Sequence, residues 1–324
     1  MTLESNCQRI ADIIKDYRRG EVPPMNVAHV RRWIGQFPEA VRASLAAEVG
    51  HVLERTYIDE EGFKTFLRGL VRNPKLVGAD PAAFWRHVCF LRLQQAGSSQ
   101  RDMLAMFETI LMEELGLALR DCGATPHTFM YLDDVVYSGG RVKSDLVGWI
   151  TQSAPKQAKV AVVSLAIHSL GEWFASQDIK EAAQAAGKTV GVDWWRSITV
   201  EDRKFRMAES DVLRPTRIPV EAADYMVQLG AEPVLRTGTG IGPLEIFSSA
   251  QGRELIEQEF LKAGVRVRQL CTMLPAQMRP LGSTLMRTTG FGSMIVTFRN
   301  CANNTPLVLW AGNPWYPLLP RRTN

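Results

Sequence analysis

The chain has 324 residues, of which 46% are hydrophobic and 22% charged, and its formal net charge at pH 7 is +4. This length suffices for about two globular domains, each with a core of its own. The mild charge permits binding to anions or nucleic acid but lacks the strong positive excess of proteins that bind nucleic acid mainly by charge.

Cysteine usage and hydropathy predict a cytoplasmic protein. The five cysteines are scattered and form no Cys-x-x-Cys pair, which favours structural thiols over a disulfide framework. The first residues lack a basic segment followed by an apolar core, and no apolar run approaches ~20 residues. We therefore expect neither secretion nor a membrane span.

The first part of the chain predicts helices. Apolar residues recur there at helical spacing, and Pro-Pro, Pro and Asn-Pro steps separate the segments. These segments are residues 10–17, 27–37, 40–53 and 62–71. Because they contain no catalytic constellation, we predict a small helical N-terminal domain over residues 1–84.

An apolar segment from Phe84 to Leu93 predicts the first strand of an α/β core. A loop follows it, and helical spacing resumes at residues 103–111. The loop contains Gly97, Ser98, Ser99 and Gln100. A strand, a Gly/Ser loop and a helix can form an anion site, because the helix N-terminus offers free backbone donors. The same residues also suit a plain loop with a serine as helix N-cap, and both interpretations stay open.

The stretch 129–142 is predicted to contain the functional site. An apolar run leads to Asp133 and Asp134, and a Ser-Gly-Gly turn then opens into a helix. Glycine lets backbone N–H groups approach a phosphate, and the helix dipole favours an anion there. The paired carboxylates can accept from vicinal ribose hydroxyls or hold Mg²⁺. A site for a sugar phosphate follows, although Asp, Ser and Gly also favour turns and caps regardless of function.

Later segments continue the alternation of strands and helices. Strand patterns at 159–167 and 189–194 flank a helical pattern at 171–186, which predicts a parallel sheet. His168, directly after a strand, is the best placed of the five histidines for chemistry. The arginine-rich residues 196–243 interrupt this alternation of strands and helices and predict an insertion.

Towards the C-terminus, a helix over residues 252–264 is expected to end at Gly264. Short strands are expected at 265–270 and 294–298, in a region rich in turns and aromatic residues.

The order of apolar strand, Asp-Asp, two apolar residues and Ser-Gly resembles the phosphoribosyl-diphosphate loop of class I phosphoribosyltransferases. The resemblance implies that Asp133 and Asp134 contact the ribose hydroxyls, and that the next loop wraps the 5′-phosphate. That loop is Ser138, Gly139, Gly140 and Arg141. It also implies that the 97–100 loop holds the pyrophosphate, although that loop lacks the usual glycine doublet or basic residue. Arg141 stands where the family usually has Thr or Ser.

Several stretches together resemble the PRTase-CE family, phosphoribosyltransferase-like proteins of bacterial conflict operons. They are Arg31-Arg32-Trp33, Gln36-Phe37, Gly97 to Gln100, Asp133-Asp134, Gly290-Phe291-Gly292 and Asn303 to Trp310. The resemblance implies a phosphoribosyltransferase-like α/β domain over residues 85–324. It further implies an effector or accessory protein of an antiphage system, with operon-encoded defence proteins as partners.

Three functions stay open. The first is an enzyme acting at the anomeric carbon of a ribose phosphate, with Mg²⁺ and the paired acids; it transfers phosphoribosyl or hydrolyses a glycosidic bond. Such chemistry relies on positioning and charge stabilisation and needs no nucleophilic triad. The second is a non-catalytic nucleotide sensor or scaffold. The third is a nucleic-acid-binding component that uses the arginines of residues 203–217 and the aromatic C-terminus.

Two properties of the central motif are also expected. The acids should be partly solvated and contribute little to core packing. Gly139 should need a positive φ and leave room for the anion, so that a β-branched residue there blocks binding.

Overall fold

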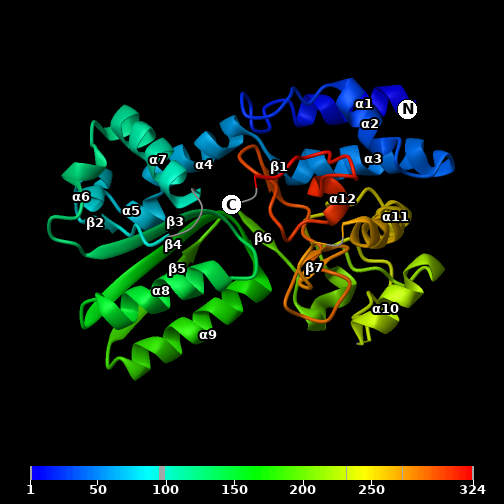
Figure 1. Cartoon of the computed structure of the whole chain (residues 1–324). Helices are drawn as coiled ribbons and strands as arrows, with labels where there is room; N and C mark the ends of the chain where they lie inside the picture. The colour runs from blue at the N-terminus through cyan, green and yellow to red at the C-terminus, as the bar shows by residue number, and fades with distance from the viewer. Residues whose placement is uncertain (1, 95–98, 231, 272, 323–324) are drawn as a thin grey trace. The chain divides into compact units, whose positions relative to one another are not determined.

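The structure is a computed structural model, and it describes residues 2–94, 99–230, 232–271 and 273–322 (Figure 1). Its internal contacts divide the chain into two compact units. Unit 1 contains residues 1–60 together with residues 200–323, and unit 2 contains residues 61–199.

Unit 2 is built around a parallel sheet. Its hydrogen-bonded order is β2 (Val88–Phe90), β3 (Thr128–Val136), β4 (Gln157–His168) and β5 (Thr189–Trp195), and β6 (Ile198–Val200) also pairs with β4. The pairs β2–β3, β3–β4 and β4–β5 are parallel, and Asp133 lies opposite Ser164. The predicted parallel α/β core is confirmed.

The first strand is shorter than expected because its predicted beginning forms helix α6 (Pro81–Arg86). Asp80 caps this helix by accepting a hydrogen bond from the Ala83 N–H at 3.0 Å, and proline occupies the first helical position. Both features favour a helix start. Trp85 is fully buried and donates from its indole to the Val71 carbonyl at 2.9 Å.

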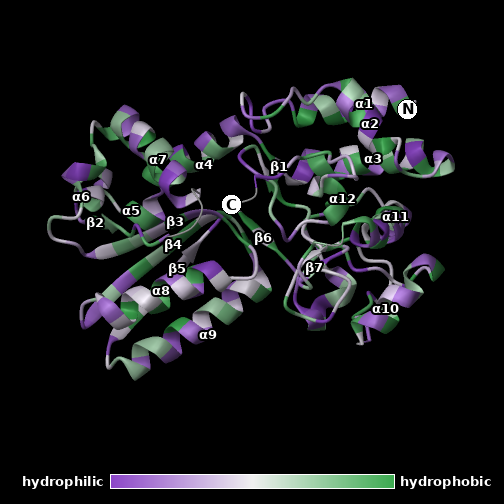
Figure 2. Cartoon of the chain, viewed as in Figure 1, coloured by the Kyte–Doolittle hydropathy of each residue, from purple (hydrophilic) through white to green (hydrophobic). Residues whose placement is uncertain are grey.

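Helices cover both faces of the sheet. On one face, α8 (Gly140–Gln152) and α9 (Ser169–Ala185) bury apolar side chains such as Leu146 and Ile179 against Tyr131 of β3. In Figure 2 both colours alternate along these helices, as expected for helices with one face on a sheet.

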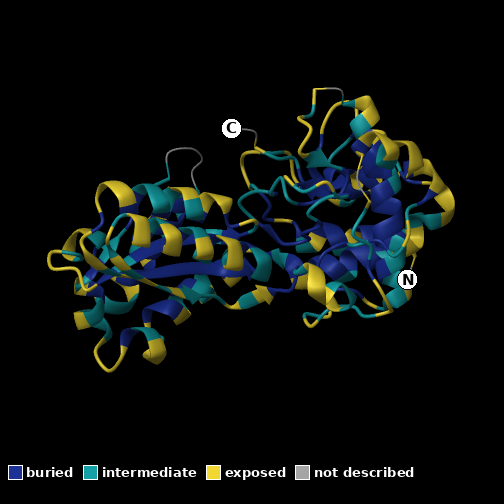
Figure 3. Ribbon diagram, turned by 90° about the horizontal axis from the view of Figure 1, so that it is seen from below, coloured by how far each residue is buried: buried dark blue, intermediate teal, exposed yellow. Residues whose placement is uncertain are grey.

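The opposite face carries α7 (Ser99–Leu115). Its Phe107 ring lies 5.5 Å from the ring of Phe90, and Phe90 aligns with Met130, whose side chain points away from the face of Tyr131. The strands are therefore covered on both sides, and Figure 3 shows β3 and β4 mostly in dark blue. This burial accounts for the continuous apolar run in β4.

The other elements of unit 2 are short and connect these layers. They are α4 (Glu60–Val71), α5 (Pro74–Val77) and the 3₁₀ turn Leu119–Asp121. Residues 61–84 are thus helical, as predicted, but they belong to the unit that contains the sheet.

Unit 1 is mainly helical and joins the two ends of the sequence. Its helices are α1 (Leu3–Ile13), α2 (Val27–Ile34), α3 (Glu39–Thr56), α10 (Ala223–Leu229), α11 (Ala250–Leu270) and α12 (Leu307–Trp310), with 3₁₀ turns at Lys204–Glu209 and Val220–Ala222. Two small sheets pair β1 (Tyr57–Ile58) with β9 (Val296–Thr297), and β7 (Met278–Arg279) with β8 (Gly282–Ser283).

An aromatic core shows why the ends of the sequence fold together. The rings of Trp33, in α2, and Phe37, in the turn after α2, pack on Phe260 and Trp315 with centroid distances of 5.7–6.3 Å. The indoles of Trp33 and Trp315 both donate to the carbonyl of Val308, at 2.8 and 2.9 Å. The chain division therefore differs from the predicted boundary at residue 84, since residues 200–323 supply the apolar partner of the first helices.

Three local expectations in unit 1 are corrected. Helix α11 continues through Leu270, so Gly264 is not its end and no strand forms at 265–270. Gly264 lies inside the helix, where a Cβ would stand 2.7 Å from the Pro280 carbonyl oxygen; glycine permits this close packing. Strand β1 interrupts the helical N-terminal region because it pairs with β9. Residues 204–243 are part of unit 1 and not an insertion in the sheet domain.

Among the described residues, the search for a helix long and apolar enough to cross a membrane finds none.

Candidate functional site

The acidic pair lies inside β3 rather than after it. Val135 and Val136, which follow the acids, still pair with Ala166 and Ile167 of β4. Strand β3 therefore continues two residues further than the motif suggested, and the turn that opens α8 begins at Tyr137.

Local hydrogen bonds set the position of the two carboxyl groups. The N–H of Asp134 donates to Asp133 Oδ1 at 2.9 Å, and the N–H of Val135 donates to Asp134 Oδ1 at 2.8 Å. Neighbouring side chains of a regular strand point to opposite faces, and β3 stays in regular register through the acids, since Asp133 pairs with Ser164 and Val135 with Ala166. The two carboxyl groups are nevertheless close enough for Asp134 to raise the pKa of Asp133.

Asp133 is only 5% exposed, which corrects the expectation of a partly solvated acid at this position, whereas Asp134 is half-buried as expected. Burial and the adjacent Asp134 carboxylate together raise the pKa of Asp133 to about 7, although a hydrogen bond from the Ser99 hydroxyl opposes the shift. Near neutral pH the Asp133 carboxyl is therefore close to half protonated. Its protonated form can donate one hydrogen bond, and the oxygens of both carboxyl groups can accept others, which suits vicinal hydroxyls.

The same pair fits a magnesium ion whose other ligands are water and phosphate oxygens, since Mg²⁺ is commonly held by one or two carboxylates. Loss of the proton from Asp133 gives the pair the charge that the ion requires. Within the described residues there is no group of three or more His, Cys, Asp or Glu side chains that could hold a metal on its own.

The glycine turn opens α8 as predicted, but its two glycines have different roles. Gly139 has φ +72°, and a Cβ there would lie 2.1 Å from the carbonyl oxygen of Gly171 in α9. A Cβ on Gly171 would in turn lie 2.0 Å from the Tyr137 carbonyl oxygen. The positive φ at Gly139 is confirmed, and the residue is needed for backbone packing between the turn and α9.

The open space of the turn lies at Gly140. This residue is exposed, and a Cβ there would meet only Ser138 Oγ, at 3.5 Å. The backbone N–H groups in the first turn of α8 are not used by helix hydrogen bonds, and the dipole of this 13-residue helix adds positive potential. Arg141, exposed in the same turn, adds a guanidinium. These features together suit an anion.

The first turn of α7 reaches the acids through Ser99, whose hydroxyl hydrogen bonds to Asp133. Gln100 behaves differently: its backbone N–H donates to Gln94 Oε1 at 2.9 Å, and its own Oε1 accepts from the N–H groups of Leu93 and Gln94. Its Nε2 is buried and has no hydrogen-bond partner among the described residues. Gly97 and Ser98, also expected at this loop, lie outside the described residues.

His168 and Tyr137 extend this end of the sheet. They follow the last paired residues of β4 and β3, and their rings lie 5.4 Å apart at an interplanar angle of 30°. His168 is fully buried at the N-cap of α9.

The sequence did not single out Gly171, Glu172 or Arg196. Glu172, in the first turn of α9, forms an ion pair with Arg196, which directly follows β5. A glycine three residues after a strand was an available signal for close packing at a helix start. Its partner, Gly139, lies 32 positions earlier, and no sequence pattern indicated that the two glycines meet.

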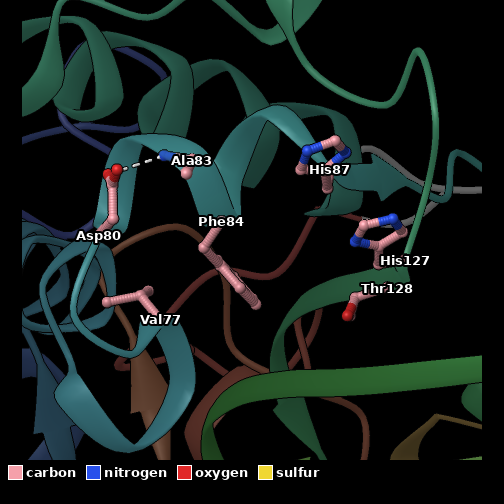
Figure 4. A pocket seen from close by; sticks show the side chains of 7 residues that line it. All are labelled: Val77, Asp80, Ala83, Phe84, His87, His127 and Thr128. Atoms are coloured by element: carbon pink, nitrogen blue, oxygen red, sulfur yellow. Dashed lines mark hydrogen bonds between the residues drawn. The ribbon is translucent and has the colours of Figure 1, made fainter.

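A separate hollow of about 310 Å³ lies at the opposite end of β3 (Figure 4). It is lined by Val77, Asp80, Ala83, Phe84, His87, His127 and Thr128. The rings of His87 and His127 stack with centroids 4.3 Å apart. None of the sequence-predicted site residues lines this hollow.

The parallel sheet, the acids near the carboxyl end of β3 and the helix N-terminus beside them define a phosphoribosyltransferase-like α/β protein. The model of one family, PRTase-CE, matches residues 30–321, and the chain belongs to that family. The suspected family is thereby confirmed, and the match extends over residues of both units. Comparisons with curated proteins and with solved structures give no match.

Proposed function

We propose that unit 2 binds a ribose 5-phosphate ligand, either phosphoribosyl diphosphate or a nucleotide, and acts at its anomeric carbon. The 5′-phosphate occupies the turn Ser138 to Arg141, and the ribose hydroxyls bind Asp133 and Asp134. The observation that carries this proposal is the pair of adjacent carboxyl groups, buried Asp133 and half-buried Asp134, which Ser99 joins to α7 and which the open glycine turn follows at the end of β3.

The chemistry follows from charge and position. Cleavage at the anomeric carbon develops positive charge on the ribose, which the neighbouring carboxylates stabilise. Ser99 and the Asp134 N–H hold Asp133 in place, so its orientation is fixed before the ligand arrives. Mg²⁺ on Asp133 and Asp134 would supply positive charge to the diphosphate oxygens of the ligand.

A second candidate is a nucleotide sensor without turnover. It is favoured by the hydrogen bonds between Gln94 and Gln100, because these already use the backbone donor of Gln100 that a diphosphate would need. In both candidates the protein is an effector or accessory component of an antiphage system that works with operon-encoded partners. Family membership supports this role.

The test is calorimetric titration of the full chain with phosphoribosyl diphosphate, adenosine monophosphate and ribose 5-phosphate, with and without Mg²⁺. The informative variant is Gly140→Val, which places a side chain in the open turn without a clash. Gly148→Val is the matched control, because Gly148 lies in the same helix and its Cβ would meet nothing within 4 Å.

We expect wild type and Gly148→Val to bind at least one of these ligands, and Gly140→Val to bind none. Product analysis of the bound ligand then separates an enzyme from a sensor. Equal binding by all three proteins would refute the phosphate position, and absence of binding by wild type would refute the ligand class.

A further inference from the structure

The arginine-rich region that the sequence offered for nucleic acid is neutralised by its own neighbours. Arg203 pairs with Glu201, Arg206 pairs with Glu209, and Arg217 pairs with Glu254. Ion-paired guanidiniums offer little net charge to a polyanion. A surface for nucleic acid must therefore be sought elsewhere in unit 1.

Three other arginines gather around the turn that ends α2. Arg42 donates from Nε to the Phe37 carbonyl at 2.9 Å and from Nη2 to the Gly35 carbonyl at 2.8 Å. Arg266 donates to the Gln36 carbonyl at 2.7 Å. The guanidinium of Arg32 lies 4.0 Å above the ring centroid of Tyr316. We call Arg32, Arg42 and Arg266 the arginine cluster.

Gln36 connects the position of the Arg32 guanidinium to the turn that Arg42 and Arg266 contact. The side chain of Gln36 donates to the Tyr316 carbonyl and accepts from the Tyr316 N–H, both at 2.8 Å. This places the ring below Arg32 beside the turn that Arg42 and Arg266 hold. Arg266 also lies 5.2 Å from the ring of Trp315. The cluster is therefore held in place by α2, α3, α11 and residues 315–316.

The positive charge of the cluster is not balanced locally. Within the described part of the chain, none of the three arginines forms an ion pair, and Glu39, three residues before Arg42, makes none with it either. A guanidinium has five N–H donors, so Arg42 keeps three and Arg266 keeps four after the bonds above. Arg32 and Arg266 are exposed.

Helix capping explains only part of this arrangement. Cations near the last carbonyls of a helix interact favourably with its dipole, and Arg42 and Arg266 serve α2 in this way. Arg32 forms no described hydrogen bond to a carbonyl, and its guanidinium lies over an aromatic ring instead. A guanidinium can bind phosphate through its donors and can also stack on a base.

We propose that the arginine cluster is a binding surface for single-stranded nucleic acid, with one phosphate on each of the three guanidiniums and a base stacked on the outer face of Arg32. This surface is independent of the ribose phosphate site of unit 2. Three phosphate contacts on a single strand give a slope of about −2 for log affinity against log salt. Raising the salt concentration fourfold then weakens binding about 20-fold.

The test is fluorescence anisotropy of labelled oligothymidylate and oligouridylate with the full chain over a range of salt concentrations. The variant is Arg32→Gln/Arg42→Gln/Arg266→Gln. The matched control is Arg203→Gln/Arg206→Gln/Arg217→Gln, which removes the same charge from ion-paired positions. We expect the control to bind as wild type does and the cluster variant to lose affinity at least 10-fold together with most of the salt dependence.

The single variant Arg32→Gln keeps the proposal testable if the triple variant fails to fold, because Arg32 makes none of the described capping bonds. It should weaken binding and flatten the salt slope by about 0.7. Equal losses in the cluster variant and the control would overturn the proposal. So would equally tight binding of polyglutamate, which would assign the cluster to acidic proteins, or loss of oligonucleotide binding in Asp133→Asn, which would place the strand in unit 2.

Discussion

Replacing Asp133 by asparagine should stabilise unit 2 at pH 8. Asp133 has a folded-state pKa of about 7, above its ordinary value of 3.8, because it is buried beside a second carboxyl. The folded state therefore holds the proton more tightly than the unfolded state. The stability contribution of this proton is complete below pH 4 and is lost as the pH rises through 7.

The magnitude follows from the size of the pKa shift. A shift of about three units corresponds to about 4 kcal/mol in the cost of the charged form. Asparagine removes that cost and can still accept the hydrogen bonds from the Asp134 N–H and Ser99. The gain in unfolding free energy at pH 8 is thus up to about 4 kcal/mol, and it falls towards zero at pH 4.

Hydrogen exchange in peptides from β3 and β4 under increasing denaturant measures unit 2 alone, at pH 8 and at pH 5 after correction for intrinsic rates. The control is Asp193→Asn, which removes a half-exposed carboxylate paired with Lys159 on the same sheet; its effect should stay within about 1 kcal/mol. If Asp133→Asn lowers the unfolding free energy at pH 8, or changes it equally at both pH values, the raised pKa of buried Asp133 is refuted.

Three further predictions concern the site and the core. Ligand affinity at the ribose site should fall as the pH drops through 7, because protonated acids accept fewer hydrogen bonds; titration calorimetry between pH 5.5 and 8.5 checks this, and a flat profile would contradict it. Gly139→Val should destabilise unit 2 by about 3 kcal/mol or more through its positive φ and its clash with Gly171, whereas Gly140→Val should melt near wild type. Glu257→Gln, which leaves buried Arg236 without its carboxylate, should cost about 3–5 kcal/mol in chemical denaturation. Its control, Glu254→Gln on the same helix, breaks an exposed pair and should cost less than about 1 kcal/mol.

The parallel core could be predicted because its signals are local. Each strand of unit 2 is a short apolar run, and the Ser-Gly-Gly turn after Asp133 and Asp134 marks the start of α8. The positive φ of Gly139 followed from the residue type. Its contact with Gly171 did not, because two backbones meet there from separate β–α turns and a sequence pattern carries no information on their distance.

Which segments of the chain assemble into unit 1 could not be predicted for the same reason. Trp33 in α2 and Phe37 in the turn after it pack on Phe260 and Trp315, more than 200 positions later, and no local pattern links them. The β-branched residues Val265 and Val267 favoured a strand at 265–270, but burial along α11 overrode that propensity. The burial of Asp133 was missed because β3 continues past the acids.

The division of unit 1 between the two ends of the chain has a consequence during synthesis. Residues 1–60 leave the ribosome with Trp33 and other core side chains only partly covered, because the C-terminal segments that complete their core come after residue 199. The intervening 139 residues, 61–199, take about 7–30 s to translate at typical rates. Unit 2, whose segments are contiguous, can complete its sheet in that interval. The nascent chain therefore passes through a stage in which unit 2 is folded while residues 1–60 still lack the C-terminal part of their core. Chaperones that bind apolar segments have this interval in which to act.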